Sequence, residues 1–295
     1  MIKAIEAVLQ DMNLQTNGAP FRYCISISTG NTISVSVYAD AHHLYQVKVS
    51  ETPAFEGEYG AHMCAWQQYN HCVPRPIGRQ VHKGWDVFVA QGVHHEPFVF
   101  NSKANGRAFG KVLGDLSQFF RISASAGKLS DANHCHELFF GVLEQHFHSS
   151  PLSLIAAHWI HQGRLLGICG LPLIAQHGDF VLNNLAYSGQ QLVVFDWEDF
   201  GKYQLPGLDI CSFCFSVAPS AQELQALMTS KTPLDTALGK FVHSACHASA
   251  IDIDLFKRLI PLYLLCFLYA KREYGDAVQS RIGAAISQLS VHAGV

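Results

Sequence analysis

The chain has 295 residues, of which 49% are hydrophobic and only 15% charged, so it is long enough to bury a large core. Its formal net charge of -3 provides no basic field for a phosphate backbone, which excludes nucleic acid as the expected main partner. We find no signal-peptide pattern and no run of the roughly 20 apolar residues that a bilayer requires, so we expect a cytoplasmic protein without a membrane partner.

Nine cysteines are scattered along the chain, a pattern typical of free thiols in a reducing compartment. Cys211 and Cys214 form a CxxC pair, but they lie in an apolar run that predicts a buried helix, where cysteine usually packs as a small hydrophobe. The run from His134 to Glu137 has no companion pair at zinc-ligand spacing. We therefore expect neither a redox site nor a zinc site.

The first half of the N-terminal region predicts an antiparallel sheet. After a short amphipathic stretch at 1–12, three runs rich in β-branched and aromatic residues occupy 21–29, 32–39 and 44–50. Gly30-Asn31 and a polar segment at 40–42 separate them. This spacing predicts a three-stranded meander.

A helix is expected next, roughly from Phe55 to Tyr69, and the prolines at 74 and 76 must end it. A further strand pair is expected at 77–79 and 85–90, after which Gly92 closes the sheet-rich unit.

From about residue 104 the pattern becomes helical, with apolar residues at i, i+3, i+4 and i+7 spacing through 108–120 and again in 138–147 and 152–166. The apolar run Leu259–Ala270 predicts a buried core helix. An isolated hairpin interrupts these helices between Ile174 and Asp196, turning at 188–190. The expected fold is α+β and bilobal: an N-lobe of residues 1–92 with an antiparallel sheet and one helix, and a larger, mainly helical C-lobe of residues 93–295.

Polar residues collect around this hairpin. Asp179 and Asn184 precede its first strand, and Asp196 follows its second. Phosphoryl transfer needs a positioned acceptor, oxygens that hold a metal ion and cancellation of phosphate charge. Asp179 suits the acceptance of a hydroxyl proton, and a tight hairpin brings Asn184 and Asp196 together as Mg²⁺ ligands. The alternative is a purely structural role, in which Asp179 and Asn184 only form turns and helix caps.

The spacing of His177, Asp179 and Asn184, followed by Asp196-Trp197-Glu198, resembles that of the aminoglycoside phosphotransferase and choline kinase-like family. The segment Leu205–Asp209 is similar to the stretch that supports the catalytic loop in that family. The resemblance implies a protein-kinase-like fold, ATP or GTP with Mg²⁺ as cofactors, and transfer of the γ-phosphate to a hydroxyl of an aminoglycoside, an amino alcohol or a sugar-like molecule. Trp197-Glu198 in place of Phe-Gly points away from a protein kinase.

The resemblance also implies a nucleotide site. Lys48 would be the third-strand lysine that contacts the phosphates, with Glu58 or its neighbour Glu56 as partner; helical periodicity does not decide between them. A lysine on an edge-like strand would otherwise only blunt that edge. Gly30 and Asn31 belong to the loop expected over the phosphates, and Gln91 to the hinge whose backbone would bind the base. One glycine in that loop is few, which leaves a pseudokinase-like nucleotide-binding module, acting through partners, as the alternative function.

Four further assignments complete the expected site. His177 is grouped with the catalytic Asp179, but as an anchor of the loop rather than a proton donor, and Asp209 would support that loop. Glu198 and Asp199 either face the acceptor or form a charged turn. Aromatic residues of the last hundred positions either cage a cationic acceptor or, as is commoner at helical spacing, belong to the core: these are Tyr203, Phe213, Tyr263, Phe267, Tyr269 and Tyr274.

Overall fold

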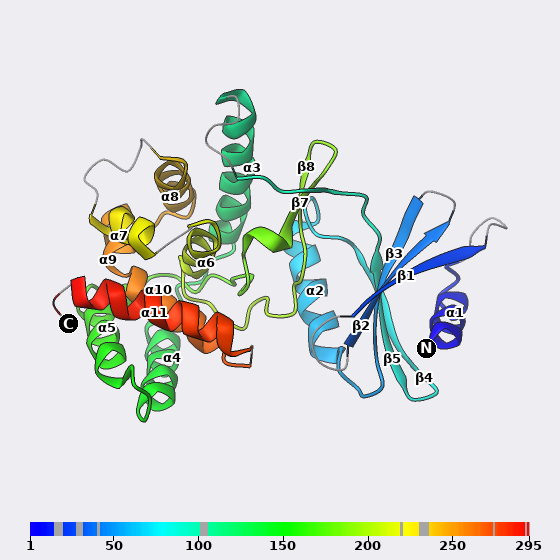
Figure 1. Ribbon diagram of the computed structural model, residues 1–295, viewed down its shortest axis with the longest axis horizontal. Coiled ribbons are helices and arrows are strands. Elements are labelled where there is room, and N and C mark those ends of the chain that lie inside the picture. Colours follow the sequence, from blue (N-terminus) through cyan, green and yellow to red (C-terminus); the bar gives the residue numbers. More distant parts are fainter. Residues whose placement is uncertain are drawn as a thin grey trace. The chain divides into compact units, whose positions relative to one another are not determined.

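The computed structural model describes residues 1–14, 20–27, 32–39, 42–100, 106–218, 221–229, 236–273, 275–292 and 294. They form two compact units (Figure 1). Unit 1 comprises Met1–Phe98 and Asn183–Phe200, and unit 2 comprises Val99–Leu182 and Gly201–Val295. Gly30 and Asn31, expected over the phosphates, lie outside the described residues, as does Tyr274.

Unit 1 is built on a five-stranded antiparallel sheet of order β1-β2-β3-β5-β4. The predicted meander is confirmed, because β1, β2 and β3 pair consecutively in antiparallel register. The strands are β1 (Phe21–Ile27), β2 (Thr32–Ala39), β3 (His42–Ser50), β4 (Pro76–His82) and β5 (Trp85–Gln91). Since β3 lies in the middle of this order, the alternative that Lys48 blunts a sheet edge is wrong.

The two faces of this sheet carry different helices. Side chains alternate along a strand, so Val47, Val49 and Val89 share one face, where they form a buried cluster with apolar residues of α1 (Ile2–Asp11). Lys48 and Phe88, which pair across β3 and β5, therefore belong to the opposite face. Phe88 packs there with Phe55, Tyr59 and His62, at the start of and within α2 (Glu56–Tyr69).

A second, smaller sheet completes unit 1. The predicted hairpin forms β7 (Leu185–Ser188) and β8 (Gln191–Val194), preceded by the 3-10 turn η2 (Leu182–Asn184). The hairpin was expected to be isolated, and this was wrong, because the two-residue strand β6 (Glu96–Pro97) pairs with β7. Two residues ending in proline show no alternation, so the sequence carries no strand signal there.

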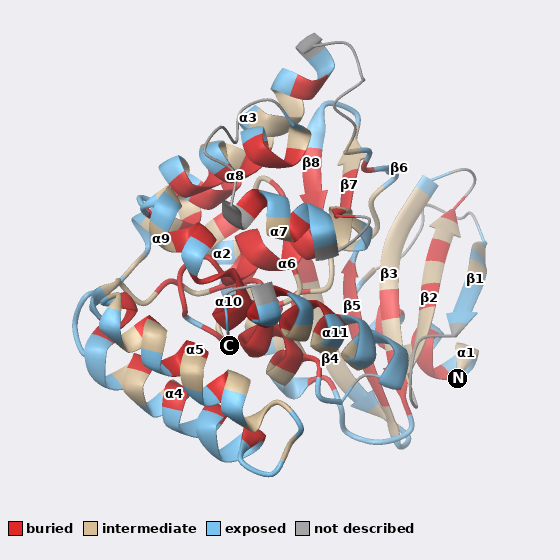
Figure 2. Ribbon diagram, turned by 60° about the vertical axis from the view of Figure 1, so that its left-hand side comes forward, coloured by how far each residue is buried: buried red, intermediate tan, exposed pale blue. Residues whose placement is uncertain are grey.

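Unit 2 is helical. Its elements are α3 (Gly106–Ser125), α4 (Ala132–Phe147), α5 (Ser153–Leu165), η1 (Ile168–Gly170), α6 (Leu208–Val217), α7 (Ala221–Thr229), α8 (Ala237–Ala248), α9 (Ile253–Arg258), α10 (Ile260–Ala270) and α11 (Asp276–His292). Its core includes α10, as predicted, and Figure 2 shows that helix almost wholly buried. In the described parts of the chain, every helix is too short or too polar to cross a bilayer.

Asp86 anchors the start of α2. Its side chain is 0% exposed and accepts hydrogen bonds from the backbone N–H groups of Ala54 and Phe55, at 2.8 and 2.9 Å. The guanidinium of Arg79 donates two more, at 2.8 and 3.1 Å. Burial by itself raises the pKa of Asp86, but the bonds from Arg79 and the two N–H groups outweigh it and lower the pKa.

Asp86→Ala should lower the free energy of unfolding by about 3 kcal/mol at pH 7, the scale for breaking a buried ion pair. Because the folded-state pKa lies below the unfolded one, the contribution of Asp86 is lost as pH falls, so the difference from wild type should shrink below about pH 4. Urea unfolding at pH 7 and pH 3.5 measures both effects. Asp11→Ala is the control, since that exposed carboxylate accepts a surface hydrogen bond from the side chain of Gln80; an equal loss in both variants would contradict the anchoring role.

Candidate functional site

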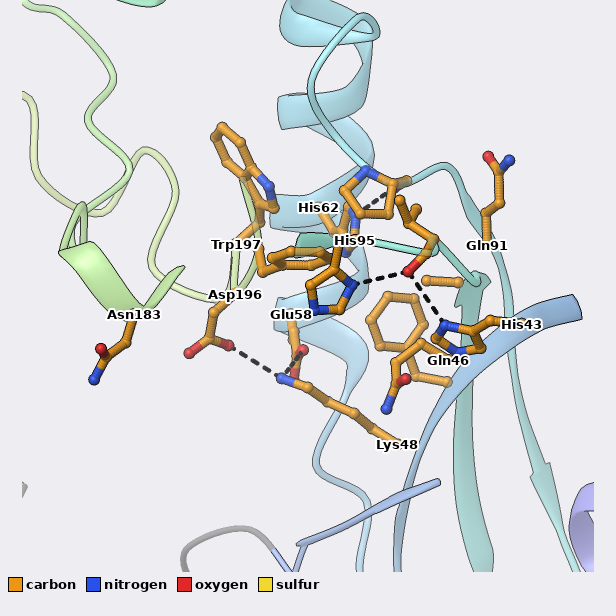
Figure 3. Close-up of a pocket in the computed structure, with 15 residues that line it drawn as sticks. His43, Gln46, Lys48, Glu58, His62, Gln91, His95, Asn183, Asp196 and Trp197 are labelled. Carbon is orange, nitrogen blue, oxygen red and sulfur yellow. Dashed lines mark hydrogen bonds and ion pairs between the residues drawn. The ribbon is translucent and has the colours of Figure 1, made fainter. Parts of the chain in front are cut away.

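The candidate site in unit 1 contains an ammonium group that lies between two carboxylates. Lys48 Nζ lies 2.6 Å from Glu58 Oε1 and 3.2 Å from Asp196 Oδ1 (Figure 3). Burial by itself lowers the pKa of Lys48, but Asp196 and Glu58 outweigh it and raise the pKa, so the side chain stays charged. A permanent cation thus projects from β3 toward the segment after β8.

Helix α2 selects Glu58 over Glu56. Glu58 is mostly buried beside Lys48, whereas the side chain of Glu56 is 92% exposed and lies 3.9 Å from Arg79. The two residues are two positions apart on a helix and point in different directions. The packing of α2 on Phe88, which periodicity could not reveal, therefore decides which carboxylate meets the lysine.

Asp196 has a left-handed backbone, with φ of 63°. Such a conformation is unfavourable for most residues and often marks a functional position. The next residue holds it in place: Trp197 is buried, donates from Nε1 to the carbonyl of Val194 at 2.8 Å, and packs on Tyr69 at a ring distance of 5.5 Å. Because Tyr69 ends α2, the same helix positions both Glu58 and Asp196.

Three carboxylates gather around Lys48. Oxygens of Glu58, Asp196 and Glu198 lie within 4.8 Å of one another. Burial, followed by repulsion from Asp196, raises the pKa of Glu198 to about 7. Carboxylate oxygens are the donors that Mg²⁺ prefers, and one ammonium cannot balance three carboxylates, so the donor set fits a divalent cation.

A cavity of about 290 Å³ opens beside this cluster. Its apolar wall includes Phe88 and Ala90, and Gln91 lies at its rim on the last residue of β5. The carbonyl oxygen of Val93 lies 3.3 Å from Nδ1 of His43 and 2.9 Å from Nδ1 of His95. The cavity is therefore mainly apolar, and its lining also carries a backbone carbonyl and two imidazoles.

Gly92 allows β3 and the end of β5 to approach closely here. A Cβ at this position would come within 2.7 Å of the backbone carbonyl oxygen of His43 and of the carbonyl carbon of Leu44. Its N–H donates to the Leu44 carbonyl at 2.8 Å. The absence of a side chain at 92 thus keeps the cavity rim in place.

The predicted metal ligand Asn184 is the last residue of η2, directly before β7. Its carbonyl accepts from the N–H of Phe195 at 2.9 Å, which ties it to the residue before Asp196. The adjacent Asn183, rather than Asn184, is among the residues that line the cavity. Asn184 and Asp196 belong to unit 1 and Asp179 to unit 2, so the meeting of all three around one cation stays a prediction.

In unit 2 the loop that carries Asp179 is fixed on both sides. Phe180 is fully buried and stacks on Phe119 with ring centres 4.6 Å apart. Asp209, in the first turn of α6, accepts from the N–H groups of His177 and Gly178 at 2.7 and 3.0 Å. The supporting contact expected of Asp209 therefore goes to the backbone of the loop.

His177 acts within the loop. Its Nδ1 accepts a hydrogen bond from the backbone N–H of Asp179 at 3.2 Å, and the side chain is buried. An Nδ1 that accepts carries no proton, so the neutral ring has its proton on Nε2. This contact fits an anchor rather than a proton donor toward Asp179.

Burial decides between alternatives that the sequence left open in the C-terminal region. Phe213 and Tyr263 are fully buried, so they cannot form part of a cage for a ligand. Cys211 and Cys214 are buried in α6, and burial raises the pKa of both thiols, which disfavours the thiolate that redox exchange requires. Lys271, whose Nζ lies 2.9 Å from Asp179 Oδ1, was not predicted as a site residue. A lysine directly after an apolar run looks like an ordinary helix end.

Comparison with solved structures identifies the fold. A protein assigned as a fructosamine-3-kinase from Haemophilus somnus 129PT matches with a TM-score of 0.61 and 12% identity over 98% of this chain and 97% of that one. The aminoglycoside phosphotransferase APH(4)-Ia, in a complex with ADP and hygromycin B, matches with a TM-score of 0.58 and 12% identity over 96% and 97%. The chain has the aminoglycoside phosphotransferase fold.

A third structure of this fold, the streptomycin-ATP complex of APH(2″)-IIa, matches with a TM-score of 0.57 and 14% identity over 96% of this chain and 95% of that one. No protein-family model and no curated protein matches the chain. The predicted bilobal, protein-kinase-like architecture is confirmed.

Asp209→Ala should lower the free energy of unfolding by about 2 kcal/mol, because two buried N–H groups lose their acceptor. Burial raises the folded-state pKa of Asp209 to about 7, above the unfolded value of about 3.9. The contribution of this carboxyl is therefore complete below about pH 4 and declines as pH rises through 7, so the loss should be larger at pH 5 than at pH 8. Urea unfolding at both pH values tests this, with the exposed Glu223→Ala as control; a loss that grows with pH would contradict it.

Proposed function

We propose that this protein is an ATP- and Mg²⁺-dependent phosphotransferase that moves the γ-phosphoryl group to a hydroxyl of a small molecule. The observation that carries the proposal is the Lys48 ammonium between Glu58 and Asp196, at the edge of a cavity of the size and polarity that a nucleotide base requires. An ion-paired lysine beside a metal-binding carboxylate is the arrangement that phosphoryl transfer uses to neutralise phosphate charge.

The residues of unit 1 would bind the nucleotide. Lys48 pairs with phosphate oxygens, and Glu58 keeps its ammonium in position. Asp196 and Asn184 hold the metal ion, with Glu198 as a further carboxylate of the same cluster. A bound Mg²⁺ would supply positive charge against the phosphate oxygens. The backbone near Gln91 would receive the base; GTP would fit the same cavity.

The loop of unit 2 would act on the acceptor. Asp179 takes the proton of the acceptor hydroxyl while the acceptor oxygen bonds to the γ-phosphorus and the bond to the β–γ bridging oxygen breaks, which releases ADP. Phe180 and Asp209 support this role because they hold the loop rigid. The fold relatives support a small-molecule acceptor, since their names include an aminoglycoside phosphotransferase and a fructosamine kinase. Nine unpaired thiols support a reducing compartment, and we propose the cytoplasm.

Asp179→Asn should lower kcat by about 10²- to 10⁴-fold, the usual contribution of a general base, while the Kd for Mg·ATP changes little. Acceptor-stimulated ADP release across hydroxylated metabolites and aminoglycosides measures kcat, and calorimetry measures Kd. Asp115→Asn, whose carboxylate pairs with Lys111 one helical turn away, is the matched control. A fully active Asp179→Asn enzyme would rule out this mechanism.

Glu58→Ala should weaken Mg·ATP binding about 10- to 100-fold, the scale for losing a group that orients a ligand-binding side chain. Glu56→Ala is the control, because it removes an exposed carboxylate from the same turn of α2. Titration calorimetry with ATP and Mg²⁺ compares the two variants. Equal affinities in both would show that the Lys48–Glu58 pair has no part in nucleotide binding.

A further inference from the structure

Lys271 is a buried lysine at the end of a buried helix. It follows α10 as its C-cap residue and is only 2% exposed. The residues of α10 that precede it are apolar and mostly buried. The ammonium group of Lys271 therefore lies in the interior of unit 2. A buried charge is strongly unfavourable without a partner, and Asp179 provides one at 2.9 Å.

Two further features stabilise the ammonium in this position. Its Nζ lies 5.8 Å from the centre of the Phe267 ring, one turn back on α10. The carbonyl end of a helix also favours a cation. Lys271 is therefore held by its own helix, independently of the loop that carries Asp179.

The loop and the lysine constrain different parts of Asp179. Phe180 and Asp209 fix the backbone on either side of it. The contact with Lys271 fixes the carboxylate itself, since it binds Oδ1. An ion pair at this distance restricts the rotamers that the Asp179 side chain can adopt.

The same ion pair changes the charge that an acceptor meets. A polyamine or quaternary ammonium compound requires unbalanced carboxylates or open aromatic faces. The charge of Asp179 is balanced by Lys271. The guanidinium carbon of Arg272 lies 4.3 Å from the centre of the Tyr269 ring, and that of Arg281 lies 4.6 Å from the centre of the Phe215 ring. Both aromatic faces are therefore already occupied by a cation of the protein.

We propose that Lys271 is a positioning residue that orients the Asp179 carboxylate, and that the acceptor is a neutral or anionic polyhydroxyl compound rather than a polycation. The inference rests on the proposed phosphotransfer. It specifies which chemical class of hydroxyl compound this loop serves: one whose reacting hydroxyl has no ammonium group beside it.

The test compares acceptors that differ mainly in charge: glucose, glucuronate and glucosamine, together with inositol, glycerate and kanamycin. Acceptor-stimulated ADP release gives kcat and KM for wild type, Lys271→Met and Lys271→Arg. We expect neutral or anionic members to stimulate wild type most. Lys271→Met should lower kcat at least tenfold and shift the preference toward glucosamine over glucuronate by at least tenfold, while Lys271→Arg keeps the wild-type order.

A purely structural role would lower kcat for every acceptor by the same factor, and that result would overturn the inference. So would a wild-type preference for kanamycin or glucosamine, or no stimulation by any neutral or anionic member. Thermal unfolding of Lys271→Met, Asp179→Asn and the double variant tests whether the two side chains interact in the folded protein. If the losses in melting temperature add, the two residues do not interact, and the inference is overturned. Failure of wild type to bind Mg·ATP would overturn the proposed function and this inference with it, whereas ATP binding with a cationic preference would overturn the inference alone.

Discussion

The placement of the Lys48 ammonium determines much of unit 1. A cation that is largely removed from solvent needs compensating carboxylates, and they come from segments far apart in sequence: Glu58 from α2 and Asp196 from the segment after β8. Strand alternation turns Lys48 toward α2, while its neighbours Val47 and Val49 enter the valine core on the other face. Alternation along β3 therefore places the hydrophobic core and the charged site on opposite faces of the sheet within the three residues Val47, Lys48 and Val49.

Each carboxylate has its own structural support. Asp86 holds the first turn of α2 through two N–H groups, which sets the position of Glu58 two residues into the helix. Trp197 packs on Tyr69 at the other end of α2 and fixes Asp196 despite its left-handed backbone. One 14-residue helix, anchored at both ends, therefore aligns the groups that contact the lysine. Rigid support of this kind is what preorganised electrostatic sites require.

The sequence carried enough information for the meander, the hairpin and the bilobal fold, because alternation, helical periodicity and turn residues are local signals. It also predicted that Lys48 meets a glutamate of the next helix. It could not choose Glu58 over Glu56, because the rotation of α2 depends on packing against Phe88. Strand β6 was missed because Glu96–Pro97 has no strand pattern of its own. Lys271 was missed because only the tertiary fold brings the end of α10 to Asp179.

Lys48 and Lys271 have opposite electrostatic consequences for what can bind. Around Lys48 three carboxylates face one ammonium, so the cluster has a donor set that would suit a divalent cation. At Lys271 the ammonium lies 2.9 Å from the Asp179 carboxylate and offsets its charge, while the nearby carboxyl of Asp209 accepts hydrogen bonds from the N–H groups of the loop. The neutral or anionic acceptor that we propose would be recognised at Asp179 through hydrogen bonds and shape. A hydroxyl group can donate a hydrogen bond to the Asp179 carboxylate and also accept one from another donor, whereas an ammonium group only donates.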